Sequence, residues 1–279
     1  MKKNRFITVN DTKMYVEQRG KGIPIIILHG WSVDHNLMSG PMEKVFRKQN
    51  KNFKRMYIDL PGMGKSSVNK DVKTADDVLT ILLSLIDILI PDESFLLAGE
   101  SWGGSLCRGI LEYKKERVLG LCLLCPVSVS GEKNIPIPDR IVLEKDGNFM
   151  SSLSENDRQY FSSLSVVQTK KFWRLFKRDI YPALLNKNKE YLEKILHGEY
   201  KNGMFKTPLH YSRPVLLMTG RQDNAVGYKD QMNYFMDFPR ASLAVLDKAG
   251  HNLQIEQEKL FQALVSDWLN RVRSFNENI

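Results

Sequence analysis

A serine, an aspartate and a histidine lie far apart in this sequence, yet each follows the end of an apolar run. They are Ser101, Asp223 and His251. A serine hydroxyl is a weak nucleophile at neutral pH, so it needs a histidine base and a carboxylate that fixes the tautomer of that base. These residue types, in this chain order, predict nucleophilic attack by Ser101 through an acyl-enzyme.

The segment around Ser101 has the order strand, sharp turn, helix. An apolar run at 95–98 leads into a G-x-S-x-G motif at 99–103. Glycines flank the serine because a Cβ there would collide with a neighbouring strand or helix. A chain of this length contains such a motif by chance roughly one time in ten. The apolar side of the helix that follows consists of Leu106, Ile110, Leu111 and Tyr113.

Five histidines are candidates for the base. His251 follows a predicted strand and opens the last predicted helix, which places it at the same sheet edge as Ser101. His29 is interpreted as a residue that braces its own loop. The other three, which lack a comparable setting, are interpreted as surface or packing residues: His35, His197 and His210.

The acid should leave the same sheet edge on an earlier strand, and Asp223 satisfies this condition. Two other carboxylates are close in sequence. Asp247 stands only four residues before His251, which limits its reach to the far ring nitrogen. Glu100 lies inside the elbow and is expected to be buried beneath it.

Two backbone N–H groups should stabilise the negative charge that develops on the substrate oxygen. Trp102 directly follows the nucleophile and supplies one of them. Trp31 follows the third predicted strand and is positioned to supply the other. Trp31 and Trp102 are therefore the predicted oxyanion hole.

Eight runs are predicted strands, and helical patterns separate most of them. The alternation predicts a doubly wound, mostly parallel α/β sheet. Thr74 is a predicted helix cap, with Asp77 three residues later in the acidic position. The predicted strands are 6–9, 13–17, 23–28, 55–58, 95–98, 118–124, 214–219 and 242–246, and the flanking helices include 38–46, 229–236 and 253–272.

This alternation of strands and helices stops after Pro126 and resumes near residue 210. The intervening residues contain no convincing strand, but they contain helical patterns at 154–164, 167–185 and 188–197. Ser154 and Ser165 are candidate caps for these helices. The chain is therefore divided into a core, residues 1–126 and 210–279, and a helical insertion, residues 127–209.

Five motifs together resemble the α/β-hydrolase superfamily. They are Leu28-His29-Gly30-Trp31, Asp59 to Ser66, Gly99 to Gly104, Gly220 to Asp223, and Gly250-His251. The resemblance implies an eight-stranded α/β-hydrolase fold, a helical cap (or lid) at 127–209, and a Ser-His-Asp hydrolase that uses no cofactor and no metal.

The nearest likenesses are to small carboxylesterases, carbon–carbon hydrolases, cofactor-free haloperoxidases and proline iminopeptidases. Superfamily members with an aspartate nucleophile are disfavoured, because position 101 is serine. Proline iminopeptidases usually carry His-Gly-Gly-Pro-Gly at the oxyanion loop, whereas this chain has Trp31 and Ser32 after Gly30.

The favoured function is hydrolysis of a small ester, thioester or related acyl compound, as in a carboxylesterase. One alternative is a small-molecule receptor or signalling protein that keeps the triad with little turnover. Others are an iminopeptidase-like peptidase, a perhydrolase or a lyase. Trp31, Met63, Trp102 and Trp173 are candidate pocket residues, and the basic residues at 170–178 are interpreted as the solvated face of a helix.

Composition limits the partners. The chain has 279 residues and a net charge of +9, with a basic stretch at 44–55 that contains no acid. No nucleic-acid motif accompanies this charge, so a solvated surface is favoured over nucleic-acid binding. The sequence of residues 64–66 ends like a phosphate-binding loop, but Asp59 stands where that loop needs glycine.

Three cysteines, at 107, 122 and 125, are interpreted as small buried side chains, although 122 and 125 form C-x-x-C. An odd cysteine count without a signal peptide predicts a cytoplasmic protein. The longest apolar stretch is too short to span a bilayer. A small-molecule substrate and a monomer or homodimer are expected.

Overall fold

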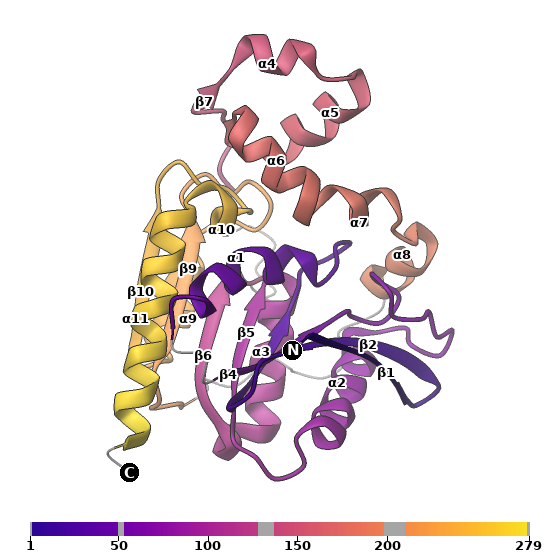
Figure 1. Cartoon of the computed structure of the whole chain (residues 1–279), viewed down its shortest axis with the longest axis vertical. Coiled ribbons are helices and arrows are strands. Elements are labelled where there is room, and N and C mark those ends of the chain that lie inside the picture. Colours follow the sequence, from indigo (N-terminus) through magenta and orange to yellow (C-terminus); the bar gives the residue numbers. More distant parts are fainter. Residues whose placement is uncertain (1, 50–52, 128–136, 198–209, 278–279) are drawn as a thin grey trace.

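The computed structural model describes residues 2–49, 53–127, 137–197 and 210–277 (Figure 1). Its main feature is an eight-stranded sheet with the order β1-β2-β4-β3-β5-β6-β9-β10. The first pairings, β1 with β2 and β2 with β4, are antiparallel, and the others are parallel. The predicted doubly wound, mostly parallel sheet is confirmed. The strands are β1 Lys2–Val9, β2 Thr12–Arg19, β3 Ile23–Leu28, β4 Phe53–Ile58, β5 Phe95–Glu100, β6 Val118–Leu124, β9 Val215–Gly220 and β10 Ala241–Leu246.

Helices cover both faces of the sheet. Alternate residues of β5 enter different cores: Phe95 and Leu97 pack with the helices α2 (Ala75–Leu89) and α3 (Trp102–Lys114). Leu96 and Ala98 pack on the other face with helices α1 (Asn36–Phe46) and α11 (Glu258–Glu277). The central strands are apolar on both sides for this reason. Short helices complete the core: η1 Lys115–Arg117, α9 Gln231–Met236 and α10 Leu253–Glu256.

Local signals in the sequence explain several boundaries. Thr74 and Asp77 form a capping box at the start of α2, as predicted. Asn10 and Asp11 have φ of 45° and 60°, the left-handed conformation that a tight β1–β2 turn needs. The predicted helix at 253–272 is in fact two helices, because Gln257 leaves the helical conformation (φ −116°, ψ 48°) between α10 and α11.

The described part of the insertion, residues 137–197, is mostly helical; its elements from β7 to α6 lie at the top of Figure 1, and α8 lies lower, at the right. The expectation that it lacks strands is wrong, since β7 and β8 form a short parallel pair. The pattern at 167–185 is broken into β8, α6 and α7. Ser154 caps α5 as predicted, but Thr169 rather than Ser165 caps α6. The elements are β7 Glu144–Lys145, α4 Gly147–Ser152, α5 Glu155–Leu164, β8 Val167–Gln168, α6 Lys170–Asp179, α7 Tyr181–Leu185 and α8 Lys189–His197.

An aromatic cluster forms the interior of this insertion. Phe161 is fully buried, and its ring centroid lies 5.2 to 5.5 Å from those of three other aromatic rings. The cluster continues into the core through Val33, Leu37 and Ile255. The basic side chains of α6 lie on its exposed side, as expected for the solvated face of an amphipathic helix. The neighbours of Phe161 are Phe172, Trp173 and Phe176.

The described residues also bear on the expected partners. Several cations of the basic stretch at 44–55 form ion pairs, which reduces its free positive charge; these are Lys44–Glu258, Lys54–Glu93 and Arg55–Glu43. All three cysteines are free and buried, in agreement with their interpretation as packing residues. Within the described ranges, no helix combines the length and apolar character needed to cross a bilayer.

Candidate active site

The three predicted catalytic side chains form one hydrogen-bonded chain. Ser101 Oγ and His251 Nε2 are 2.8 Å apart, and His251 Nδ1 and Asp223 Oδ2 are also 2.8 Å apart. The parallel register of the strands explains the meeting. Because Glu100 pairs with Leu124 on β6, and Gly220 pairs with Leu246 on β10, the residues after these strand ends reach the same sheet edge.

The serine stands on a strained turn. Ser101 has φ 53° and ψ −122°, a backbone conformation that L-residues rarely adopt. Its N–H donates to Leu124 O at 2.8 Å, which fixes the turn against β6. A Cβ on Gly99 would lie 2.4 Å from Gly103 O, and one on Gly103 would lie 2.4 Å from His29 O. Both flanking glycines are therefore required by close backbone packing.

Two backbone hydrogen bonds orient the Asp223 carboxylate toward His251. Its Oδ1 accepts N–H groups from Ala225 and Val226 at 2.9 and 3.1 Å, which leaves Oδ2 for the ring. The competing candidate, Asp247, is exposed and accepts a hydrogen bond from Gln222 instead. The acid that contacts Nδ1 is thus Asp223.

Electrostatics favours a charged ring beside charged carboxylates. Burial alone lowers the pKa of His251, but Asp223 and Glu100 outweigh this effect and raise the pKa to about 9. Burial raises the pKa of Asp223. The charge and hydrogen bond of His251 and two backbone N–H groups lower the pKa by more, so the net shift is downward. The arrangement stabilises the imidazolium that forms when the serine loses its proton.

The two predicted oxyanion donors belong to neighbouring residues. Trp102 is the first residue of α3, and Trp31 stands in the loop between β3 and α1. Their rings meet edge to face, with centroids 4.7 Å apart. The structure therefore brings the Trp31 loop beside the elbow, as an oxyanion hole built from both segments requires.

Comparison with known proteins agrees with this fold. The sequence profile of the α/β-hydrolase fold family matches residues 23–258. The chain belongs to the α/β-hydrolase family.

Relatives of the hydrolase are similar over almost their whole length. The chain is 24% identical over 275 residues to AB hydrolase superfamily protein YisY of Bacillus subtilis (strain 168), covering 94% of this chain and 97% of YisY. An alpha/beta superfamily hydrolase from Oenococcus oeni PSU-1 has a TM-score of 0.85 and 28% identity, covering 97% of this chain and 99% of that one. A thermophilic esterase from Thermogutta terrifontis shares the fold, with a TM-score of 0.68 and 18% identity over 98% and 99% of the two chains.

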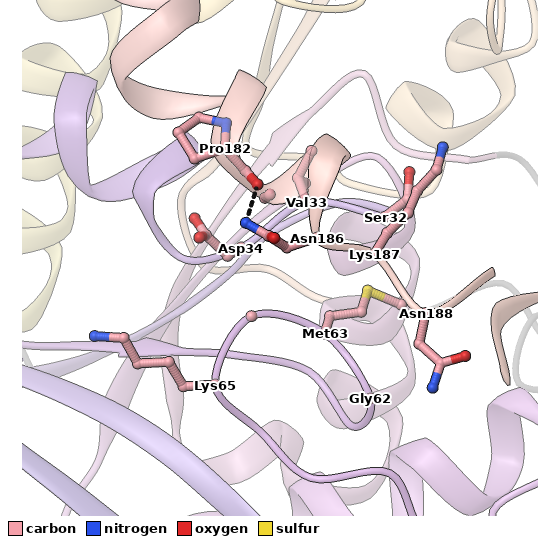
Figure 2. A pocket seen from close by; sticks show the side chains of 12 residues that line it. Ser32, Val33, Asp34, Gly62, Met63, Lys65, Pro182, Asn186, Lys187 and Asn188 are labelled. Carbon is pink, nitrogen blue, oxygen red and sulfur yellow. Dashed lines mark hydrogen bonds between the residues drawn. The ribbon is translucent and has the colours of Figure 1, made fainter.

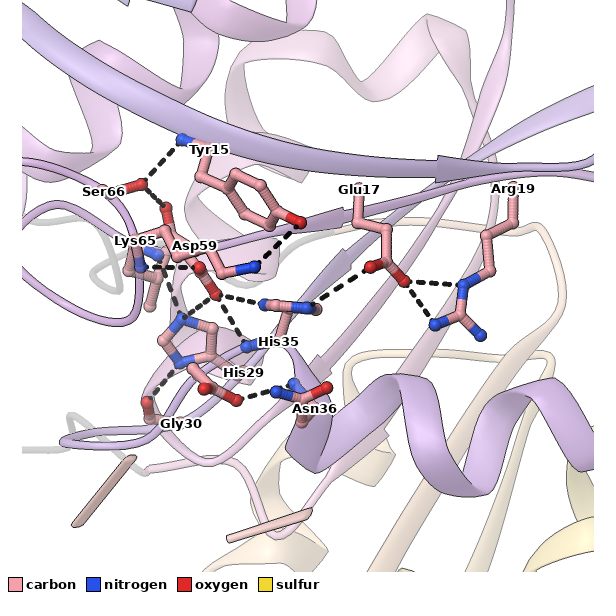
Figure 3. A network of polar contacts seen from close by, with 12 residues as sticks. Tyr15, Glu17, Arg19, His29, Gly30, His35, Asn36, Asp59, Lys65 and Ser66 are labelled. Carbon is pink, nitrogen blue, oxygen red and sulfur yellow. Dashed lines mark hydrogen bonds and ion pairs between the residues drawn. The ribbon is translucent and has the colours of Figure 1, made fainter. Parts of the chain in front are cut away.

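A buried polar network braces the loop that carries Trp31 (Figure 3). Asp59, which follows β4, accepts hydrogen bonds from the His35 backbone and ring and from the Lys65 backbone, each at 2.8 Å. His29 Nε2 accepts the Leu60 N–H at 3.0 Å, in agreement with its predicted bracing role. The network ties two loops of the hydrolase together beside the candidate active site.

His35 has a larger role than the sequence suggested. It is buried, and its Nε2 lies 3.6 Å from Glu17 Oε2 on β2. Burial lowers its pKa, but hydrogen bonds to Asp59 and Glu17 outweigh this and raise the pKa to about 9. The only sequence signal was the position of Asp59 directly after a strand, because Glu17 and His35 follow no recognisable motif.

A cavity of about 370 Å³ lies where the loops after β3 and β4 face the insertion (Figure 2). Met63, a predicted pocket residue, contributes to its wall. Trp173, another predicted pocket residue, packs instead in the aromatic cluster, 5.8 Å from the Phe176 ring. The lining consists of Ser32, Val33, Asp34, Gly62, Met63, Gly64, Lys65, Pro182, Ala183, Asn186, Lys187 and Asn188.

The insertion is attached next to His251. Glu256 on α10 accepts N–H groups from Gly250 at 2.6 Å and from Val166 and Val167 at 2.7 and 3.3 Å. Asn252 donates its side-chain N–H to Leu164 O at 3.1 Å. Glu256 therefore links the Gly250 backbone to Val166 and Val167, and Asn252 holds Leu164. Sequence reasoning missed this attachment.

Cys125 also lies beside the triad. With Asp223 and His251 it places three atoms of metal-ligating type within 4.8 Å of one another. The Asp223 carboxylate and the His251 ring are hydrogen-bonded to each other there. Burial raises the pKa of the Cys125 thiol well above its usual value. A metal would need the thiolate, so these residues fit a triad better than a metal site.

Proposed function

We propose that this hydrolase is a serine esterase that acts on a small ester or thioester through an acyl-enzyme. The observation that carries the proposal is the continuous chain from Asp223 through His251 to Ser101, with 2.8 Å at both hydrogen bonds. Such a chain is the minimum needed to activate a serine hydroxyl.

The reaction follows from the proton positions. His251 Nδ1–H donates to Asp223, so Nε2 carries the lone pair that takes the Ser101 proton as Oγ attacks the carbonyl carbon. The amides of Trp31 and Trp102 stabilise the oxyanion. The Nε2 proton then passes to the leaving alcohol or thiol, and a water activated by the same nitrogen releases the acid.

Ser101→Ala tests the proposal. Loss of the nucleophile should reduce kcat for p-nitrophenyl acetate or butyrate by about 10⁶-fold and abolish labelling by a fluorophosphonate. Ser105→Ala is a matched control, since Ser105 is buried on α3, the helix that follows Ser101, and donates to Val127 O. It should keep activity within tenfold. Fluorophosphonate labelling that persists in Ser101→Ala would refute the assignment.

The same experiments separate the other functions that use these side chains. Tight ligand binding without ester turnover would support a receptor. Peroxide-dependent halogenation that exceeds ester hydrolysis would support a perhydrolase. Preference for an amino-acid arylamide would support a peptidase.

A further inference from the structure

Glu100 is a buried carboxyl group that the proposed triad does not use. It directly precedes the nucleophile, and its side chain is 2% exposed. Its Oε1 lies 3.3 Å from His251 Nε2, and its carboxylate also accepts the Gly30 N–H. A Cβ on Gly30 would lie 2.2 Å from Glu100 Oε2, so the glycine leaves room for the carboxylate.

Each ring nitrogen of His251 therefore has a buried carboxylate beside it. Asp223 lies 2.8 Å from Nδ1, and Glu100 lies 3.3 Å from Nε2. We propose that Glu100 is a second carboxylate partner of His251, which stabilises the protonated ring at Nε2 while Asp223 stabilises it at Nδ1. This inference rests on the proposed function, because it concerns the base of that reaction.

The charge state of Glu100 suits this role. Burial raises the pKa of Glu100 to about 7, although the charge of His251 acts in the opposite direction. The carboxyl group is thus balanced near neutral pH, and a proton arriving on His251 favours its ionised form. When Ser101 gives its proton to Nε2, the new charge forms next to an acceptor that is already in place.

Other titratable groups face this pair. Asp223 approaches from the loop after β9 and Glu256 from α10, and both favour a charged His251. Cys125 approaches from the end of β6, but burial keeps its thiol neutral because the pKa is raised. Of the carboxylates that favour the charged ring, Glu100 is the one within 3.3 Å of Nε2.

Glu100→Gln separates charge from shape. The glutamine oxygen can still accept the Gly30 N–H, but the side chain carries no charge. A neutral His251 is needed to accept the serine proton, so the acidic limb of kcat/KM against pH reports the pKa of His251. We expect the limb to move by about one unit to lower pH. The plateau should fall by no more than about tenfold, because the imidazolium loses one partner.

The control is Asp247→Asn, which removes an exposed carboxylate from the loop just before His251. Its acidic limb should coincide with that of the unmodified protein. If Glu100→Gln also leaves the limb in place, Glu100 only fills space and the inference is wrong. Glu100→Ala should move the limb in the same direction, which keeps the test available if the glutamine variant folds poorly.

A second readout does not depend on turnover. The ring protons of His251, assigned by their loss in His251→Ala, should titrate at lower pH in Glu100→Gln than in the unmodified protein. An unchanged titration would overturn the inference even if ester hydrolysis is robust. Conversely, absence of Ser101-dependent hydrolysis would refute the proposed function, while this titration would still decide the role of Glu100.

Discussion

The triad and the insertion are held in place by different interactions. The Ser101 N–H donates to Leu124 O at 2.8 Å, and Asp223 Oδ1 accepts two backbone N–H groups at 2.9 and 3.1 Å. The insertion instead depends on aromatic packing around Phe161 and on a few hydrogen bonds near Glu256. Each residue of the first region lies in a short recognisable motif, whereas the residues that hold the second region lie in none.

The largest expected effect concerns the triad. Asp223→Asn cannot accept the Nδ1–H in the same way and disturbs the tautomer of His251, so kcat should fall by about 10⁴-fold. The midpoint temperature of thermal unfolding should stay close to that of the unmodified protein. Steady-state kinetics with p-nitrophenyl acetate measures the loss, and Asp247→Asn provides the matched control. A loss below tenfold would show that another carboxylate orients the ring.

A smaller effect is expected inside the insertion. Phe161→Ala removes the centre of the aromatic cluster and should destabilise it by about 3–5 kcal/mol. Amide exchange should accelerate in α5 and α6, while β5 and β9 stay protected. Phe6→Ala is the control, because Phe6 is 51% exposed. Equal loss of protection in the sheet would show that the insertion and core unfold as one unit, which contradicts the comparison.

The smallest effect should appear where the two regions meet. In Glu256→Gln, the side-chain NH₂ group faces a backbone N–H group that the carboxylate accepts in the unmodified protein. Because two donors cannot bond to each other, the change should destabilise the protein by about 1–3 kcal/mol. Amide exchange should rise both at 164–168 and at 250–252. Glu112→Gln, an exposed glutamate on α3, is the control. A rise in the insertion alone would mean that Glu256 does not couple it to the histidine loop.

The contrast also explains what the sequence could predict. The elbow, the strand ends and the order of Ser101, Asp223 and His251 are each encoded within a few residues, so they were accessible without a structure. The roles of His35 and Glu256 were not, because neither residue belongs to a recognisable motif that would indicate partners 24 and 90 residues away. In the sequence, Glu256 cannot be distinguished from a solvent-exposed glutamate on a short helix.

The break in the predicted helix at 167–185 has a similar origin. Its apolar periodicity continues across the break, but Ile180 leaves the helical conformation and Pro182 stands in the first turn of the next helix. The two-residue strands β7 and β8 are too short for period-two alternation to reveal them. Pairing between segments more than 20 residues apart decides their conformation.

The attachment through Glu256 has a consequence for how the insertion can change. The carboxylate recognises main-chain N–H groups at 166 and 167, which every residue except proline supplies. New side chains can therefore be introduced elsewhere in the insertion without removing its anchor. A library that varies positions 182–188 while retaining segment 164–168 would redesign the cavity wall and leave the histidine loop intact.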